Sequence, residues 1–274
     1  MAAAGHSEDA PAHAAAAIES AEFVRLVATA DGDSLTAAGL LARGLDTTGI
    51  PYQASLAAVP EPPATEADCT VAIGHPTGDV TLQNAPLALE AVSILEALAP
   101  EAVDLELALA GAVCTGNDPP GQLVERANIE RRPGVAIPTD DPIDGIAGST
   151  LVHAGFSGDT DVTETALSEL EEATGRDLAS FVALSALEDA PPRAAEAIER
   201  TLRPYVTDRF ETLGGFADVL DAVARVQPGT GLALALGNDV ETAAQSVWQT
   251  HGQRAHTILR TAETGRYEGL YVLR

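Results

Sequence analysis

The chain has 274 residues, of which 41 are Asp or Glu and 15 are basic, so its formal charge at pH 7 is −26. All the basic residues are Arg. Because 46% of the residues are apolar, the chain is not a disordered polyanion, which would lack the apolar area that offsets the entropy of ordering. The acidic residues are scattered rather than gathered in blocks, which favours adaptation to molar salt over mimicry of a nucleic acid or capture of a basic partner. The charge therefore does not exclude a nucleic-acid ligand.

Several other classes of protein are disfavoured. Cys69 and Cys114 stand alone in apolar surroundings, which indicates buried thiols in a reducing compartment rather than a zinc site. The sequence contains neither a phosphate-loop motif nor a supported Ser/His/Asp set. It also has no signal-like start and no apolar run that could cross a bilayer. We expect a soluble, cytoplasmic protein with no membrane contact.

The order of predicted elements divides the chain into four parts. Residues 1–14 are expected to form a flexible arm, and residues 15–150 an α/β domain with a helical extension. Residues 151–203 are expected to form a helical connector, and residues 204–274 a smaller C-terminal α/β domain. The predicted fold class is therefore α/β.

The first part has the pattern of a parallel sheet flanked by helices. An apolar run at residues 23–28 predicts a buried strand, and residues 34–45 predict a helix with Asp33 or Ser34 as its N-cap. Strands are predicted at residues 52–59 and 69–73, and a short helix at residues 15–21. This spacing favours parallel pairing, with sites at the carboxyl ends of the strands.

The rest of the chain is mostly helical in pattern. Helices are predicted at residues 86–98, 103–114, 122–129, 160–173, 177–187, 193–202, 215–225 and 240–264. Short strands are predicted at residues 135–137, 204–212, 231–236 and 267–273.

The turn Asp31-Gly32-Asp33 follows the first strand and precedes a helix. Two carboxylates in such a turn suit a hard divalent cation such as Mg²⁺ or Mn²⁺. His75 and Asp79, in the loop after the third predicted strand, are candidate further ligands. The alternative is that the Asp pair forms a solvated capping turn and that the second loop is an ordinary turn.

The segment that begins at Val24, VRLVATADGDSLTAAGLLAR, resembles the first motif of the DHH phosphoesterase superfamily, in particular its archaeal RecJ-like branch. NAPLALEAVSILEAL, from Asn84, is similar to the helix after the third metal motif of that family, and LAGAV, from Leu109, to a later helix. The segment from Arg209, RFETLGGFADVLDAVARVQPGTGLALALG, resembles the C-terminal substrate-binding half. The resemblance extends over most of the chain from about residue 22.

The resemblance implies an α/β domain that binds two Mn²⁺ or Mg²⁺ ions for phosphodiester hydrolysis, with Asp31 and Asp33 among the ligands. The chain departs from the family pattern at the other ligand positions. Val27 takes the place of a His and Thr29 that of an Asp. The Asp at the end of the next metal strand is replaced around residues 73–74, with His75 adjacent, and residues 81–84 replace the Asp-His-His triplet. The C-terminal Gly-Gly-His signature becomes Gly-Gly-Phe. These losses predict a retained fold with a degenerate metal centre.

The first hypothesis is therefore a RecJ-like protein of DNA replication or repair that acts by binding single-stranded nucleic acid or a replication protein such as the GINS complex. Its expected nucleic-acid-binding residues are Arg209, Gly214, Gly215, Phe216 and Arg225, although ordinary core and surface roles also fit these residues. The alternative is an active metal-dependent 5′-3′ exonuclease of single-stranded DNA, or a small phosphodiesterase. A generic α/β scaffold is a third possibility.

Overall fold

The computed structural model describes residues 10–59, 67–170, 174–187, 195–267 and 270–273. Residues 1–9 of the expected arm lie outside the described residues. The expected arm also includes the start of a helix, because α1 (Ala10–Glu19) begins five residues before the predicted helix.

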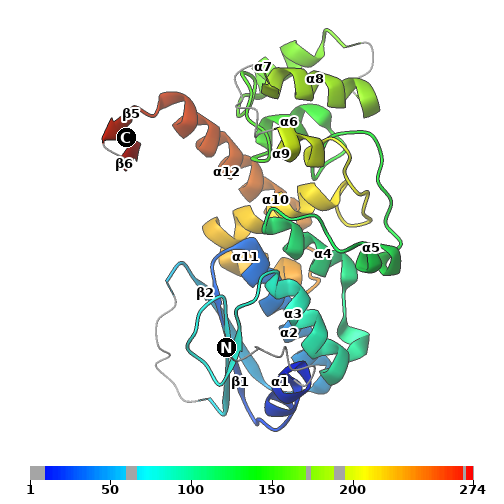
Figure 1. Cartoon of the computed structure of the whole chain (residues 1–274), viewed down its shortest axis with the longest axis vertical. Coiled ribbons are helices and arrows are strands. Elements are labelled where there is room, and N and C mark those ends of the chain that lie inside the picture. Colours follow the sequence, from blue (N-terminus) through cyan, green and yellow to red (C-terminus); the bar gives the residue numbers. More distant parts are fainter. Residues whose placement is uncertain (1–9, 60–66, 171–173, 188–194, 268–269, 274) are drawn as a thin grey trace, which may run out of the picture.

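A four-stranded parallel sheet forms the base of the molecule, which confirms the predicted fold class (Figure 1). Its order is β2-β1-β3-β4, with β1 (Val24–Thr29) paired to both β2 (Tyr52–Ala57) and β3 (Cys69–Ile73). The short β4 (Val80–Leu82), which the sequence pattern did not predict, forms the edge beside β3. Strand β1 is buried along nearly its whole length, as its continuous apolar run predicts for a strand covered on both faces.

Helix α2 (Gly32–Thr48) is the centre of the main core and packs against α3 (Leu87–Leu98), α4 (Leu105–Cys114), α10 (Leu213–Val226) and α11 (Pro228–Ala235). Small residues allow this crowding in a chain with few aromatic residues. A Cβ added at Gly39 would lie 2.3 Å from the Cβ of Ala235, so α2 and α11 meet almost backbone to backbone. A short 3₁₀ turn, η1 (Pro100–Ala102), connects α3 to α4.

The middle of the chain forms a second lobe with its own small core. Helix α5 (Gly121–Ala127) still packs against α4, with its Val124 in the main core. Helices α6 (Pro142–Gly148), α7 (Thr160–Leu167), α8 (Gly175–Leu187) and α9 (Ala195–Thr201) then follow one another in the second lobe. Figure 1 shows α6 to α9 above the sheet domain. This second core includes Ile146, Phe156 and Val182.

The C-terminal part returns to the main core. Helix α10 packs against both α2 and α4, and its Phe216 and Val223 belong to the same apolar cluster as β1. Helix α12 (Glu241–Thr261) crosses α10 and leads to the antiparallel hairpin of β5 (Thr264–Tyr267) and β6 (Leu270–Leu273).

Three predicted strands were wrong. Residues 231–236 belong mostly to α11, because Pro228 starts a helix and Gly231, Leu234 and Ala235 form a buried face at helical spacing. Residues 135–137 have no strand, and residues 204–212 contribute only the isolated bridges Arg131↔Tyr205 and Val206↔Thr212. Among the described helices, none is long and apolar enough to cross a membrane.

Candidate functional site

The turn after β1 places Asp31 at the start of α2. Asp31 is the N-cap, in place of the predicted Asp33 or Ser34: its Oδ1 accepts a hydrogen bond from Ser34 N at 2.8 Å and its Oδ2 accepts one from Ser34 Oγ at 2.9 Å. This arrangement satisfies a first-turn amide of α2 and places negative charge at the positive end of the helix. The side chain of Asp31 therefore has a structural role as the cap of α2.

Asp33, in the first turn of α2, accepts hydrogen bonds from a different helix, α3. Its side chain is 5% exposed, and its two oxygens accept hydrogen bonds from Leu87 N at 2.7 Å and Ala88 N at 2.9 Å. Those amides open α3, whose N-cap residue, Pro86, provides no side-chain acceptor. Burial raises the pKa of Asp33 to about 6, against the opposing effect of the two amide donors. One carboxylate from α2 thus caps the first turn of α3.

His75 and Asp79 lie at opposite ends of β3. His75 follows the carboxyl end of β3, and its Nε2 lies 3.0 Å from Val27 O. Asp79 precedes β4, and its Oδ2 accepts a hydrogen bond from Thr70 N at 2.8 Å, near the amino end of β3. Asp79 instead lines a cavity of about 680 Å³ beside α1. The four predicted ligands do not come together.

The donor set does not fit a two-metal centre. Each oxygen of Asp31 and Asp33 already accepts a hydrogen bond from a main-chain amide or a hydroxyl. Within the described part of the chain, no three His, Cys, Asp or Glu side chains lie close enough together to hold a metal ion. A pair of hydrolytic cations needs several convergent oxygen or imidazole ligands.

A further group of polar residues on α10 lies beside the Asp turn. Asp221 accepts a hydrogen bond from Gly32 N at 3.2 Å and forms an ion pair with Arg225 at 2.9 Å. The hydrogen bonds from Arg225 to Asp221 are the main reason why the pKa of Arg225 is raised. Burial raises the pKa of the Cys114 thiol well above its usual value, and nearby carboxylates add to the effect, so this thiol is unreactive. The spacing of Asp221 and Arg225 by four residues was the sequence signal for this pair.

Buried carboxylates also hold α10 to its neighbours. Asp218 accepts hydrogen bonds from Trp248 Nε1 at 2.7 Å and Thr150 N at 2.9 Å, and it also pairs with the Thr150 hydroxyl. Burial raises the pKa of Asp218. This carboxylate links α10 to α12 and to the loop after α6, so it too serves the fold.

The predicted nucleic-acid-binding residues are mostly engaged within the protein. Phe216 is wholly buried against Phe210, with 4.6 Å between ring centroids. Arg209 Nε donates to Glu241 at 2.7 Å, and a Cβ added at Gly215 would lie 2.2 Å from the main-chain carbon of Ile137. Of these predicted residues, Gly214 alone lines a described cavity.

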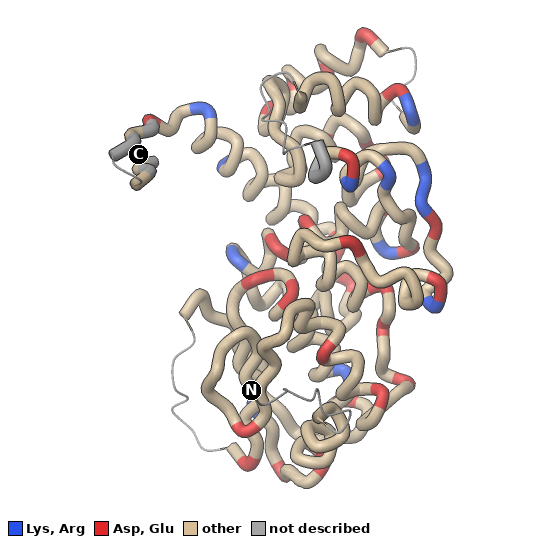
Figure 2. Tube along the Cα trace, viewed as in Figure 1, with Lys and Arg blue, Asp and Glu red and all other residues tan. Residues whose placement is uncertain are grey.

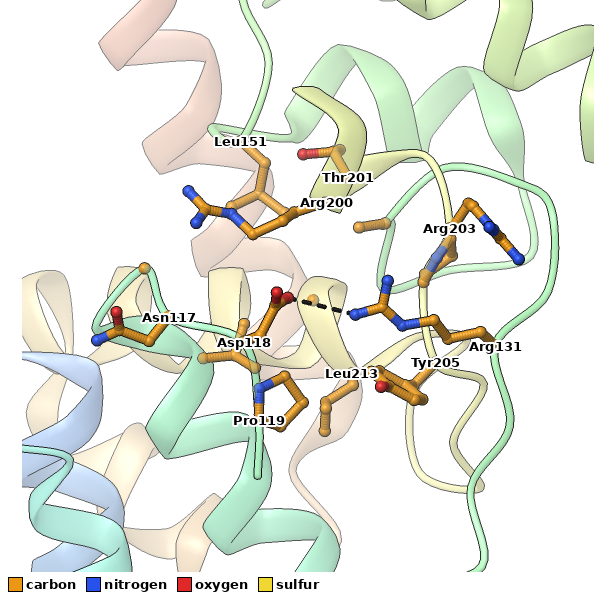
Figure 3. Close-up of a pocket in the computed structure, with 15 residues that line it drawn as sticks. Asn117, Asp118, Pro119, Arg131, Leu151, Arg200, Thr201, Arg203, Tyr205 and Leu213 are labelled. Atoms are coloured by element: carbon orange, nitrogen blue, oxygen red, sulfur yellow. Dashed lines mark hydrogen bonds and ion pairs between the residues drawn. The ribbon is translucent and has the colours of Figure 1, made fainter. Parts of the chain in front are cut away.

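That cavity, of about 180 Å³, lies between the loop after α4 and the segment that joins α9 to α10 (Figure 3). Its lining includes Arg131, Arg200, Arg203 and Tyr205, and we call it the arginine cavity. Local sequence pattern does not predict the cavity, because its walls come from positions around 117, 131 and 200–214 that only the tertiary fold brings together. The adjacent Arg131 and Arg132 were the one feature of the local sequence that pointed to this cavity.

The chain is thus an α/β protein with a parallel sheet and a carboxylate-capped turn at the end of β1. It is 46% identical to the uncharacterized protein rrnAC1427 of Haloarcula marismortui, in an alignment of 295 residues that covers 96% of this chain and 74% of that protein. The chain belongs to the family of that protein. No protein-family model matches it.

Two solved structures are similar over 92% of the chain. One is exonuclease RecJ bound to manganese, with a TM-score of 0.44, 14% identity and 67% of that chain covered. The other is RecJ in complex with Mn²⁺ from Thermus thermophilus, with a TM-score of 0.35 and 15% identity; this chain spans 38% of it. At these TM-scores the similarity to the two structures does not indicate what this chain does.

Proposed function

We propose that the chain is a RecJ-like protein of DNA replication or repair that acts by binding, and that its metal centre is degenerate. In this proposal the α/β core supports a surface for single-stranded nucleic acid or a replication protein. Asp31 and Asp33 then serve the fold and not a hydrolytic reaction.

The observation that carries this proposal is the position of Asp33. A metal-binding carboxylate must present oxygen lone pairs to a shared ion, whereas both oxygens of Asp33 face first-turn amides of α3 at 2.7 and 2.9 Å. The replacement of family ligands by Val27, by Thr29 and around residues 73–74 supports the same interpretation.

The test is hydrolysis of single-stranded DNA and of dinucleotides in molar KCl with Mn²⁺ or Mg²⁺, beside binding of the same strand without metal. We expect binding without metal-dependent cleavage. Strong cleavage that is abolished by Asp31→Asn, in a variant that keeps the wild-type unfolding midpoint, would contradict the proposal. Asn preserves the N-cap of α2, so this variant separates loss of a ligand from loss of folding.

One observation favours the alternative, an active 5′-3′ exonuclease. Asp31, Asp33 and Asp221 all act electrostatically on Cys114, so several carboxylates lie around the start of α2. The same cleavage assay decides between the two functions.

The GINS complex, the partner class that the resemblance implies, is tested by titrating purified archaeal GINS into the labelled protein in molar KCl. Saturable binding is the expected result.

A further inference from the structure

The arginine cavity reverses the charge balance of the molecule. Three of the chain's 15 Arg residues line it, with Asp118 as the one carboxylate among the lining residues, although acids outnumber bases by 26 overall. Figure 2 shows basic residues gathered along the same side, over α5 and the loop that follows it. A local positive excess in so acidic a chain indicates an anionic partner.

Arg131 is held in place before any ligand arrives. One of its terminal nitrogens lies 3.3 Å from Asp118 Oδ1, and its guanidinium lies over the ring of Tyr205 at 4.6 Å from the centroid (Figure 3). The backbone supports this stacking, because Arg131 and Tyr205 face each other in an antiparallel bridge. An ordered guanidinium loses less side-chain entropy when it binds a ligand.

Arg200 and Arg203 have no such neutralising partner. Both are exposed, and in the described part of the chain neither has a carboxylate within ion-pair distance. Some described Arg residues find acids, as Arg43 does with Asp104 at 3.2 Å and Arg126 with Glu96 at 2.9 Å, whereas the exposed Arg132, Arg176 and Arg254 form no ion pair with a described acid. Arg200 and Arg203 differ from those residues in that they line one cavity together with Arg131, and this cluster favours an anionic ligand.

The remaining walls fit a phosphate group. Gly214, in the first turn of α10, lines the cavity, while the neighbouring amides of Leu213 and Gly215 already donate to Tyr205 O and Thr212 Oγ1, so the Arg side chains provide the positive charge. The volume of about 180 Å³ is below the range of about 300–1,000 Å³ that holds drug-sized ligands. It therefore suits one phosphate group, with the rest of the ligand outside.

We propose that the arginine cavity is a phosphate-binding site that takes one phosphate of a nucleotide or a nucleic-acid strand. Arg131 supplies a positioned guanidinium, whose planar shape matches phosphate oxygens with paired hydrogen bonds. Arg200 and Arg203, whose side chains run to opposite sides of the cavity, add positive charge at its rim (Figure 3). Molar salt screens charges over about 3 Å, so direct contacts, and not long-range attraction, provide the affinity. That the ligand is a nucleic-acid strand rests on the proposed function. That the cavity binds a phosphate group does not depend on it.

The experiment measures fluorescence anisotropy of a labelled oligothymidylate with a 5′ phosphate, over a series of KCl concentrations. The variants are wild type, the double variant Arg200→Gln with Arg203→Gln, and the control Arg254→Gln, which removes an exposed Arg of α12 that does not line the cavity. We expect the double variant to bind about tenfold more weakly or worse, with a shallower salt dependence, and the control to match wild type. The exposed positions of the substituted residues favour an unchanged fold, which the unfolding midpoint verifies.

Competition by inorganic phosphate and by thymidine monophosphate distinguishes the source of the phosphate. Displacement of the oligonucleotide by either in wild type supports the site, and so does direct binding of either one that is lost in the double variant. If wild type binds phosphate or nucleotide at these Arg residues but no strand, the cavity proposal holds and the strand-binding function fails. If wild type binds the strand and the double variant binds it equally well, the cavity proposal is overturned while the function stands. No binding of any of the three probes contradicts both.

Discussion

The Asp turn at the end of β1 and the arginine cavity carry opposite charges, and they differ most in how those charges are satisfied. Each carboxylate oxygen of Asp31 and Asp33 accepts a hydrogen bond from α2 or α3. At the cavity, Arg200 and Arg203 have no carboxylate partner among the described residues. The first region looks functional in the sequence, and its carboxylates accept hydrogen bonds from the fold. The second is inconspicuous in the sequence, and two of its Arg side chains have no acid partner among the described residues.

This contrast teaches that the partners of a polar group matter more than its type. A buried carboxylate is expensive unless it is hydrogen-bonded, and Asp33 meets that requirement with main-chain amides. An exposed guanidinium has no such requirement. It remains available to bind an anionic ligand unless an acidic side chain pairs with it.

The largest expected effect comes from Asp33→Ala. The substitution leaves Leu87 N and Ala88 N without their acceptors in a buried place, and relief from burying the carboxylate offsets part of the loss. We expect a loss of about 2 kcal/mol in the free energy of unfolding, measured by urea denaturation in molar KCl. Asp31→Asn is the matched control and should change stability by a few tenths of a kcal/mol at most, since Asn caps as well as Asp. If Asp33→Ala were as stable as wild type, Asp33 would not stabilise the start of α3.

The pH dependence of stability gives an intermediate effect. The pKa of Asp33 is about 6 in the folded protein and has its ordinary value of 3.8 in the unfolded chain. At pH values between these two, the folded protein therefore holds a proton on Asp33 that the unfolded chain has lost. This group therefore adds stability as the pH falls from 7 to 5, by about 1 kcal/mol, and loses it as the pH rises through 6. The measurement compares the urea midpoints of wild type and Asp33→Asn, which cannot titrate, so that the other acids cancel. Parallel pH profiles of the two proteins would show that Asp33 does not titrate in this range.

The smallest effect on stability is expected for Arg131→Gln. The substitution removes an ion pair with Asp118 and a stacking contact with Tyr205, both at the surface. Thermal unfolding should show a loss below about 1 kcal/mol, because exposed pairs contribute little. Binding of the labelled oligonucleotide should weaken measurably in the same variant. A large loss of stability would mean that Arg131 is a structural residue like Asp33, and the contrast between the two regions would fail.

Much of the sheet domain could be predicted from local pattern. The apolar run of β1, the Asp-Gly-Asp turn and the helix after it were all visible, because each depends on residues close in sequence. Helices α3, α4 and α12 were also confirmed within a few residues of their predicted bounds. The strand predicted at residues 231–236 failed, because small apolar residues fit either period until Pro228 and the contact with α2 decide.

The roles of the polar residues could not be predicted in the same way. The partners of Asp33 lie 54 and 55 positions further along the chain, and those of Asp218 lie on two other segments. Phe216 belongs to the core because α10 packs against α2 and α4, a contact that no local pattern encodes. The arginine cavity depends on three distant segments that meet only after folding.

The central claim is that Asp31 and Asp33 hold helices and not a pair of metal ions. Electron paramagnetic resonance of free Mn²⁺, titrated with the protein in molar KCl, counts the ions that each chain binds and compares wild type with Asp31→Asn. The account predicts that wild type does not bind two ions tightly, and that the two proteins give the same titration. Two tightly bound Mn²⁺ ions per wild-type chain, lost in the variant, would contradict it.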